Sequence, residues 1–131
     1  MKPDGILETA LYVDNLEEAE EFYKNIIGLE LKAKAADRHL FFQCGPGMLL
    51  IFNPKTTSVK TGPVPAHGAT GSGHVAFKIP DTDFDKWRDH FKNHSIEIEA
   101  EIDWPEGSQS IYLRDPAGNS LELTTPKTWN L

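Results

Sequence analysis

Cysteine, long apolar runs and basic residues are all scarce in this chain of 131 residues. The single cysteine, Cys44, cannot form a disulfide within the chain. No apolar run approaches the roughly 18 residues that a membrane-spanning helix needs, and no basic segment followed by an apolar one marks a secretory signal. We therefore expect a cytoplasmic protein that folds without disulfides.

The shortage of basic residues argues against polyanionic partners. Lys and Arg total 13 against 20 Asp and Glu, a formal net charge of −7 at pH 7. Affinity for nucleic acids and anionic membranes comes largely from basic side chains that neutralise phosphates, so we expect neither as a partner. The length fits one domain, or two small halves that share a core.

Residues 5–53 have the pattern of a βαβββ module. Apolar and polar residues alternate over 6–13, as in a strand, and an apolar stripe over 16–26 is typical of a helix. Asp14 is the predicted helix cap, and Gly28 supplies the left-handed stop. Three further strands are predicted over 29–34, 38–44 and 48–52.

The same order returns after a linker rich in Gly and Pro over 54–73, and fills a second module over 74–126. Its predicted helix lies within 83–94, and its predicted strands cover 74–79, 96–101, 109–114 and 120–125. The opening Glu8-Thr-Ala-Leu-Tyr-Val matches His74-Val-Ala-Phe-Lys-Ile, which indicates an internal duplication. The sequence therefore predicts an α+β fold, a single domain over 1–131 whose two βαβββ modules enclose a half-open, barrel-like cleft.

Three polar residues interrupt the apolar pattern of the strands. Glu8 and His74 occupy equivalent positions in the first strand of each module, and Glu122 lies between Leu121 and Leu123 in the last strand. Strand alternation puts all three side chains on the face opposite the apolar one, toward the expected cleft. Taken singly, each has an ordinary alternative, a solvent-facing glutamate or a satisfied histidine.

Together these three residues fit a catalytic metal centre. A glutamate in an apolar strand is costly unless it is paired, hydrogen-bonded or bound to a cation. Three protein ligands, Glu8, His74 and Glu122, leave coordination positions open for substrate and water. Two carboxylates and one histidine suit a divalent Mn, Fe, Ni, Zn or Mg ion without selecting one. In an alternative arrangement, Glu8 is a general base beside a metal that fewer protein groups hold.

Four more residues are candidates for the substrate pocket or the chemistry. Arg38 and Tyr112 have the strand parity of the cleft, and Trp104 lies in the loop that enters the strand of Tyr112. An arginine suits an anionic group and aromatics suit an apolar one, whereas surface exposure and core packing are the alternatives. His67 is an acid/base candidate or outer ligand in the linker, or an exposed loop histidine. His39 is interpreted as a strand-surface residue.

In its paired modules and ordered segments, the chain resembles the vicinal oxygen chelate superfamily. The segments are Glu8-Thr-Ala-Leu-Tyr-Val, Gly73-His-Val-Ala-Phe and Arg114-Asp-Pro-Ala-Gly-Asn-Ser-Leu-Glu-Leu. The superfamily includes glyoxalase I, extradiol dioxygenases, fosfomycin-resistance transferases and bleomycin-resistance proteins. Its metal ligands lie on the first and last strands of each module, so the resemblance places Glu8, His74 and Glu122 at ligand positions. The pattern of glyoxalase I would add a glutamate near Leu50, and none is present.

The resemblance implies a metal-dependent enzyme of the glyoxalase or dioxygenase type, acting on a small-molecule substrate that binds the metal through oxygen atoms. The alternative is a metal-free protein that binds a small molecule, such as an antibiotic, as bleomycin-resistance proteins do. Members of the superfamily also exchange modules between subunits, and each module has exposed sheet edges. We therefore expect a homodimer.

Overall fold

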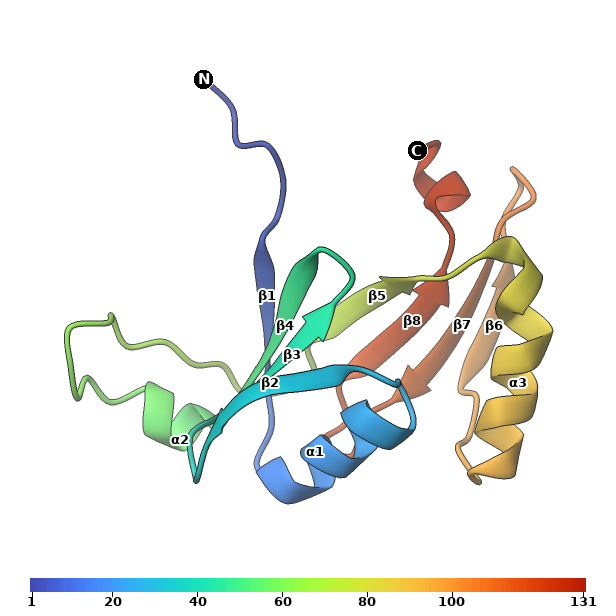
Figure 1. Ribbon diagram of the computed structural model, residues 1–131. Helices are drawn as coiled ribbons and strands as arrows, with labels where there is room; N and C mark the ends of the chain where they lie inside the picture. Colours follow the sequence, from blue (N-terminus) through green and yellow to red (C-terminus); the bar gives the residue numbers. More distant parts are fainter. The chain divides into compact units, whose positions relative to one another are not determined.

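A computed structural model describes all 131 residues and divides them into two compact units, Met1–Gly71 and Ser72–Leu131. The division falls inside the predicted linker. Each unit contains one four-stranded sheet and one long helix, labelled in Figure 1.

The first unit is a βαβββ module followed by a short helix. Its elements are β1 (Glu8–Tyr12), α1 (Leu16–Asn25), β2 (Glu30–Ala35), β3 (His39–Cys44), β4 (Gly47–Phe52) and α2 (Pro54–Thr57). The strand order is β1-β4-β3-β2, in which β1 runs parallel to β4 and the other neighbours are antiparallel. Helix α2 is one turn of regular structure inside the predicted linker, where Asn53 caps it and Pro54 begins it.

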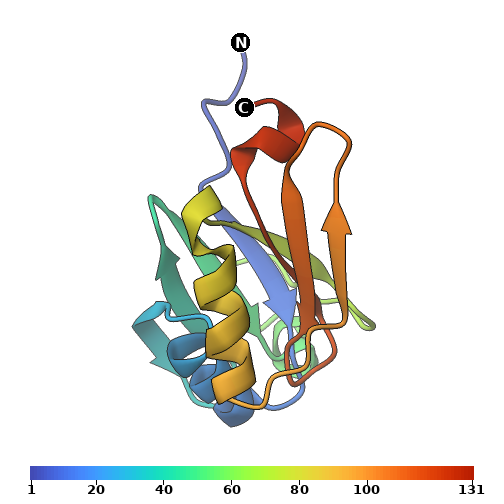
Figure 2. The same cartoon turned by 90° about the vertical axis from the view of Figure 1, so that its right-hand side faces the viewer.

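The second unit repeats this arrangement. Its elements are β5 (His74–Lys78), η1 (Asp81–Asp83), α3 (Phe84–Asn93), β6 (Ala100–Asp103), β7 (Gln109–Arg114), β8 (Ser120–Thr124) and η2 (Pro126–Trp129). The strand order β5-β8-β7-β6 corresponds position by position to that of the first unit, with β5 parallel to β8. Figure 2 shows β6 and β7 as the antiparallel hairpin of this sheet. The α+β fold of two βαβββ modules is therefore confirmed.

The central strands β4 and β8 separate an apolar core from a second, different face. In β4, Leu49 and Ile51 are almost fully buried, on the side where α1 contacts β3 and β4. In β8, Leu121 and Leu123 are equally buried, with Glu122 between them on the opposite face. Burial of each such aliphatic side chain contributes roughly 1.5 to 3 kcal/mol. Because side chains alternate along a strand, the residues that pack into this core determine which residues lie on the opposite face of the sheet.

The structure places two predicted features, a helix cap and the start of a strand, at residues other than those expected. Helix α1 is capped by Asn15 rather than Asp14, because the Asn15 side chain accepts the backbone N–H of Glu18 at 3.1 Å. The strand predicted over 96–101 begins only at Ala100. Ser95 leaves α3 with φ 56°, and the Ile96 N–H bonds back to the Phe91 carbonyl, so the chain stays tied to the helix end.

The turn between β7 and β8 holds the beginning of β5 in place. The buried Asp115 carboxylate accepts the backbone N–H groups of Ala117 and Asn119 and the side-chain amide of Asn119. The Asn119 side-chain oxygen in turn accepts the N–H of Gly73 at 2.8 Å. Since Gly73 directly precedes His74, this turn sets where β5 starts.

We expect Asn119→Ala to lower the free energy of unfolding by about 1 to 3 kcal/mol, because it leaves buried partners of the amide without their hydrogen bonds. Urea denaturation measures this loss. The matched control is Asn93→Ala at the exposed end of α3, which should stay within about 0.5 kcal/mol of the parent protein. Equal effects of the two variants would contradict a structural role for the turn.

Candidate functional site

Glu122 places a carboxylate in the middle of the second unit's sheet. Its side chain is 9% exposed, and the Ser110 hydroxyl on β7 donates a hydrogen bond to its Oε1. Burial of a carboxylate is unfavourable unless its oxygens are hydrogen-bonded or a cation balances the charge. Ser110 satisfies one oxygen, and Oε2 is left to face His74.

His74 opens β5 with one ring nitrogen held by the backbone and the other turned toward Glu122. Its Nδ1 lies 3.0 Å from the Ser120 carbonyl oxygen. A carbonyl oxygen only accepts, so Nδ1 carries the hydrogen. In the neutral ring Nε2 then has a lone pair, and it lies 3.4 Å from Oε2 of Glu122. Two lone pairs at this distance call for a cation between them, either a proton on Nε2 or a metal ion.

Trp104 and Tyr112 complete the surroundings of Glu122. The indole N–H of Trp104 donates to the Ser110 hydroxyl at 2.8 Å, and this hydroxyl in turn lies within donating distance of Glu122 Oε1 and of Thr124 Oγ1. Tyr112 pairs with Glu122 across β7 and β8, and its ring lies 6.4 Å from that of His74. Burial raises the pKa of the Tyr112 phenol, and the Glu122 charge raises this pKa further. The predicted substrate-binding residues Trp104 and Tyr112 thus lie beside His74 and Glu122.

The other predicted site residues line a single pocket of the first unit, with a volume of about 820 Å³. Its walls include Glu8, Ala10 and Tyr12 of β1, Met48, Leu50 and Phe52 of β4, Phe41 of β3, and Arg38, His39 and His67. Glu8 is exposed on this wall. The pocket has the size range of small-molecule sites.

His67 closes one side of this pocket rather than pointing freely into solvent. Its Nδ1 lies 2.7 Å from the Tyr12 hydroxyl, and its ring packs edge-on against Phe52 with centroids 4.6 Å apart. The backbone N–H of His67 also donates to the Thr57 carbonyl at the end of α2. The loop is therefore anchored to both β1 and α2.

His39, interpreted from the sequence as a strand-surface residue, lies on the wall of this pocket. The side chain is half-buried on the pocket wall and stacks on Phe41 at 4.0 Å with an interplanar angle of 8°. The Arg38 guanidinium donates to its Nδ1 at 2.8 Å. Burial lowers the pKa of His39, and the charge of Arg38 lowers this pKa further. The sequence did contain a signal for this position of His39, because strand alternation puts His39 and Phe41 on one face of the same strand.

The registers show how the two modules differ at corresponding positions. Ala10 pairs with Leu50 in the first unit as Ala76 pairs with Glu122 in the second. Leu50 therefore occupies the place that Glu122 has in the duplicate, and Glu8 occupies the place of His74. The first module presents an apolar wall where the second presents a carboxylate.

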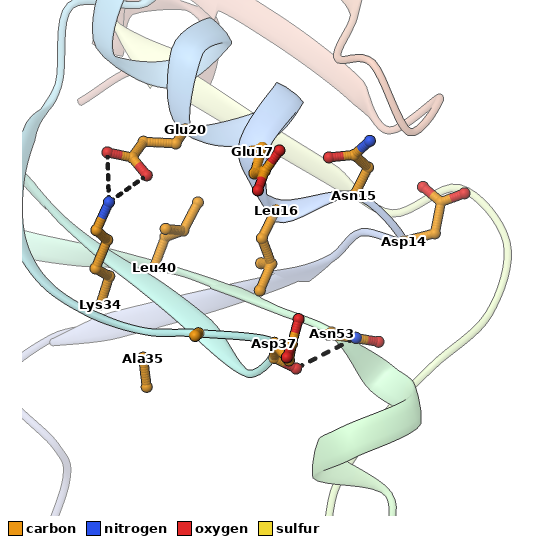
Figure 3. A pocket seen from close by; sticks show the side chains of 11 residues that line it. Asp14, Asn15, Leu16, Glu17, Glu20, Lys34, Ala35, Asp37, Leu40 and Asn53 are labelled. Carbon is orange, nitrogen blue, oxygen red and sulfur yellow. Dashed lines mark hydrogen bonds and ion pairs between the residues drawn. The ribbon is translucent and has the colours of Figure 1, made fainter.

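A smaller pocket of about 330 Å³ lies at the start of α1. Figure 3 shows the carboxylates of Asp14, Glu17 and Asp37 around it, with Lys34 bound to Glu20. Most of the polar side chains that line this pocket are acidic or already form a hydrogen bond with a neighbouring residue. None of the predicted site residues lies in it.

Neither unit by itself gathers three His, Cys, Asp or Glu side chains into a group able to hold a metal ion. None of the helices has the length and apolar character needed to span a membrane.

Residues 5–123 match the Glyoxalase/Bleomycin resistance protein/Dioxygenase superfamily. The chain belongs to this superfamily. A solved lactoylglutathione lyase from Agrobacterium tumefaciens is 42% identical, with full coverage of both chains and a TM-score of 0.96. Metallothiol transferase FosB from Staphylococcus haemolyticus is 29% identical over 123 residues, which cover 92% of this chain and 83% of FosB. The fosfomycin resistance protein FosX from Listeria monocytogenes shares the superfamily fold, with a TM-score of 0.74 at 19% identity and 98% coverage of both chains.

Replacing Arg38 by glutamine should raise the pKa of His39, because the neighbouring positive charge no longer disfavours protonation. The pKa should remain below the ordinary value of about 6.5, since burial is the larger cause of the depression. An NMR titration of the imidazole measures the change. Lys92→Gln, an equal charge change on the exposed face of α3, should leave this pKa unaltered, and an unchanged His39 in both variants would contradict the contact.

Proposed function

We propose that this protein is a metal-dependent enzyme that binds a small-molecule substrate through oxygen atoms on a divalent metal ion. His74 and Glu122 are the central ligands, and Glu8 is the third. The observation that carries this proposal is the approach of His74 Nε2 to Glu122 Oε2 at 3.4 Å, with the opposite atom of each side chain already held by a hydrogen bond.

The donor chemistry of this pair suits a metal ion. The Ser120 carbonyl fixes the tautomer of His74 that leaves Nε2 free to ligate, and Ser110 orients the Glu122 carboxylate. Such outer hydrogen bonds are the usual supports of histidine and carboxylate ligands. A histidine with one or two carboxylates accepts Mn, Fe, Ni, Zn or Mg, and the proposal does not select among them.

The case for Glu8 rests on equivalence rather than on a contact. Glu8 corresponds to His74 in the duplicated module and lines the pocket of the first unit. As a third ligand it would leave positions for substrate and water. As a general base beside the ion, it would instead accept a substrate proton.

Each remaining polar group has a distinct role in this proposal. A bound divalent ion supplies Lewis-acid polarisation of substrate oxygens. Ser110 and Trp104 hold the Glu122 carboxylate in place, and Tyr112 keeps its proton beside this carboxylate because its pKa is raised. His67, fixed by Tyr12, is an acid/base candidate at the pocket wall.

Among reactions of the superfamily we favour a lyase or isomerase reaction. The support is the 42% identity and full mutual coverage shared with the Agrobacterium tumefaciens protein named lactoylglutathione lyase. The likeness to FosB, at 29% identity, makes a transferase the second candidate. A panel containing the hemithioacetal of methylglyoxal and glutathione, fosfomycin with a thiol, and catechol separates these reactions from a dioxygenase.

Purified protein should bind one divalent transition metal ion, and its melting temperature should rise when Mn²⁺ or Zn²⁺ is added. Replacing His74 or Glu122 by glutamine should weaken metal binding by at least about tenfold, and Ser110→Ala by roughly 10- to 100-fold, because the carboxylate loses its orientation. Competition with a chromophoric chelator measures the affinities.

The controls separate ligation from general effects on folding. Glu97→Gln removes an exposed carboxylate, and Ser108→Ala removes a buried hydroxyl that bonds to Glu106 instead of Glu122. Both should retain the parent metal affinity. If neither metal shifts the melting temperature of the parent protein, a metal-free binding protein replaces the enzyme proposal.

The homodimer also belongs to the proposal. We expect a dimer in sedimentation experiments at micromolar concentration, because the edge strands of both sheets have unpaired backbone groups that a second chain can cover. A monomer under these conditions would exclude an exchange of modules between subunits, and Glu8, His74 and Glu122 would then have to come from one chain.

A further inference from the structure

A network of four hydroxyl groups connects the Glu122 carboxylate with the C-terminal turn η2. Its members, in the order of their contacts, are Ser110, Thr124, Thr128 and Ser108. Neighbouring oxygens in this hydroxyl network are 3.1, 2.7 and 3.0 Å apart. All its members except Thr128 are buried in the second unit, so their hydrogen bonds come mainly from one another and from adjacent backbone groups.

Each hydroxyl has one proton to donate, so the hydroxyl network has fewer protons than contacts. The Ser108 proton goes to the Glu106 carboxylate at 2.7 Å, a charged acceptor that binds more strongly than a neutral oxygen. The Thr124 hydroxyl lies 2.8 Å from the Gln109 carbonyl oxygen, which can only accept, so the Thr124 proton goes there. Thr124 then has no proton left for Thr128, and Thr128 is the donor in their contact at 2.7 Å.

Ser110 has two acceptors within reach of its single proton. These are Oε1 of Glu122 and, at 3.1 Å, the hydroxyl oxygen of Thr124. The indole N–H of Trp104 already donates to Ser110, so this residue contributes no acceptor. Tyr112, whose raised pKa keeps the proton on its phenol, is a further donor toward Glu122. The share of the Ser110 proton that Glu122 receives determines how firmly the carboxylate is held.

Thr128 controls this share through Thr124. With Thr128 as donor, the Thr124 oxygen already accepts a hydrogen bond, and Ser110 can give its proton to Glu122. Without that donor, Ser110 is the hydroxyl that remains beside the buried Thr124 oxygen. A buried acceptor without a donor is costly, so the Ser110 proton would then be divided between Thr124 and Glu122.

We propose that Thr128 is a positioning residue for the Glu122 carboxylate and acts through Thr124 and Ser110. Its own hydrogen bonds go to other hydroxyls, and it lies on η2, outside the strands of the sheet. This inference rests on the proposed function in one respect, that Glu122 is a metal ligand. Hydrogen bonds beyond the ligands commonly set the affinity of a metal site, and the C-terminal turn belongs to that support here.

Competition of the full chain with a chromophoric chelator for Mn²⁺ or Zn²⁺ tests the proposal. Thr128→Val removes the hydroxyl at nearly constant shape and should weaken metal binding by about three- to tenfold, the usual effect of one neutral hydrogen bond. Thr128→Ser keeps the hydroxyl and should bind the metal as the parent protein does. The matched control is Thr125→Val, which removes a buried hydroxyl that has no hydrogen-bond partner and should leave the affinity unaltered.

A double variant separates positioning from a general effect on folding. Thr124→Val removes the acceptor that competes for the Ser110 proton. In this background, Thr128→Val should have no further effect on metal affinity. A purely structural contribution of Thr128 would instead lower the affinity by the same factor in both backgrounds.

The indole proton of Trp104 provides a readout that needs no metal. It donates to Ser110, and hydrogen bonds in series strengthen one another, so its NMR resonance lies farther downfield when Ser110 donates to a carboxylate. In buffer freed of metal by a chelating resin, Thr128→Val should move this resonance upfield, whereas Thr128→Ser and Thr125→Val should not. Trp104→Phe identifies the resonance among those of the three tryptophans.

The proposal is overturned if Thr128→Val leaves the Trp104 resonance in place, if Thr128→Ser behaves like Thr128→Val, or if Thr128→Val weakens metal binding equally with and without Thr124. A shifted resonance in a protein that binds no metal would remove the proposed function and leave the positioning of Glu122. Metal binding by the parent with an unshifted resonance in Thr128→Val would leave the proposed function and remove the positioning.

Discussion

A carboxylate in the middle of an apolar strand constrains the whole second unit. The Glu122 side chain is only 9% exposed, between leucines that are nearly inaccessible, so its charge must be balanced within the sheet. Ser110 serves one oxygen and His74 approaches the other. The indole N–H of Trp104 then donates a hydrogen bond to Ser110, and the Ser120 carbonyl accepts one from the ring of His74. The turn at Asp115 and Asn119 fixes the strand ends that make these contacts meet.

The two modules use one topology for different chemical surfaces. Corresponding positions hold Glu122 in β8 and Leu50 in β4, and Tyr112 in β7 and Phe41 in β3. The second unit therefore concentrates polar groups around a carboxylate, whereas the first forms an apolar pocket with a few charged groups at its walls.

Membership in the superfamily and the full-length likeness to a lactoylglutathione lyase make an enzyme the simplest interpretation of this chemistry. The absence of a glutamate at Leu50 distinguishes the chain from the four-ligand pattern that the resemblance to glyoxalase I suggested. A site with fewer protein ligands leaves more of the coordination sphere to substrate and water.

The sequence alone determined the duplicated βαβββ topology and the face on which Glu122 lies, because alternation and helical periodicity are local properties repeated in both halves. It also identified Glu8, His74 and Glu122 as candidate ligands, a prediction that stays open. Only the tertiary structure placed Ser110 against Glu122, the Ser120 carbonyl against His74, and His39 within a pocket. These contacts join residues on neighbouring strands, and their register depends on turns and bulges that no local pattern specifies.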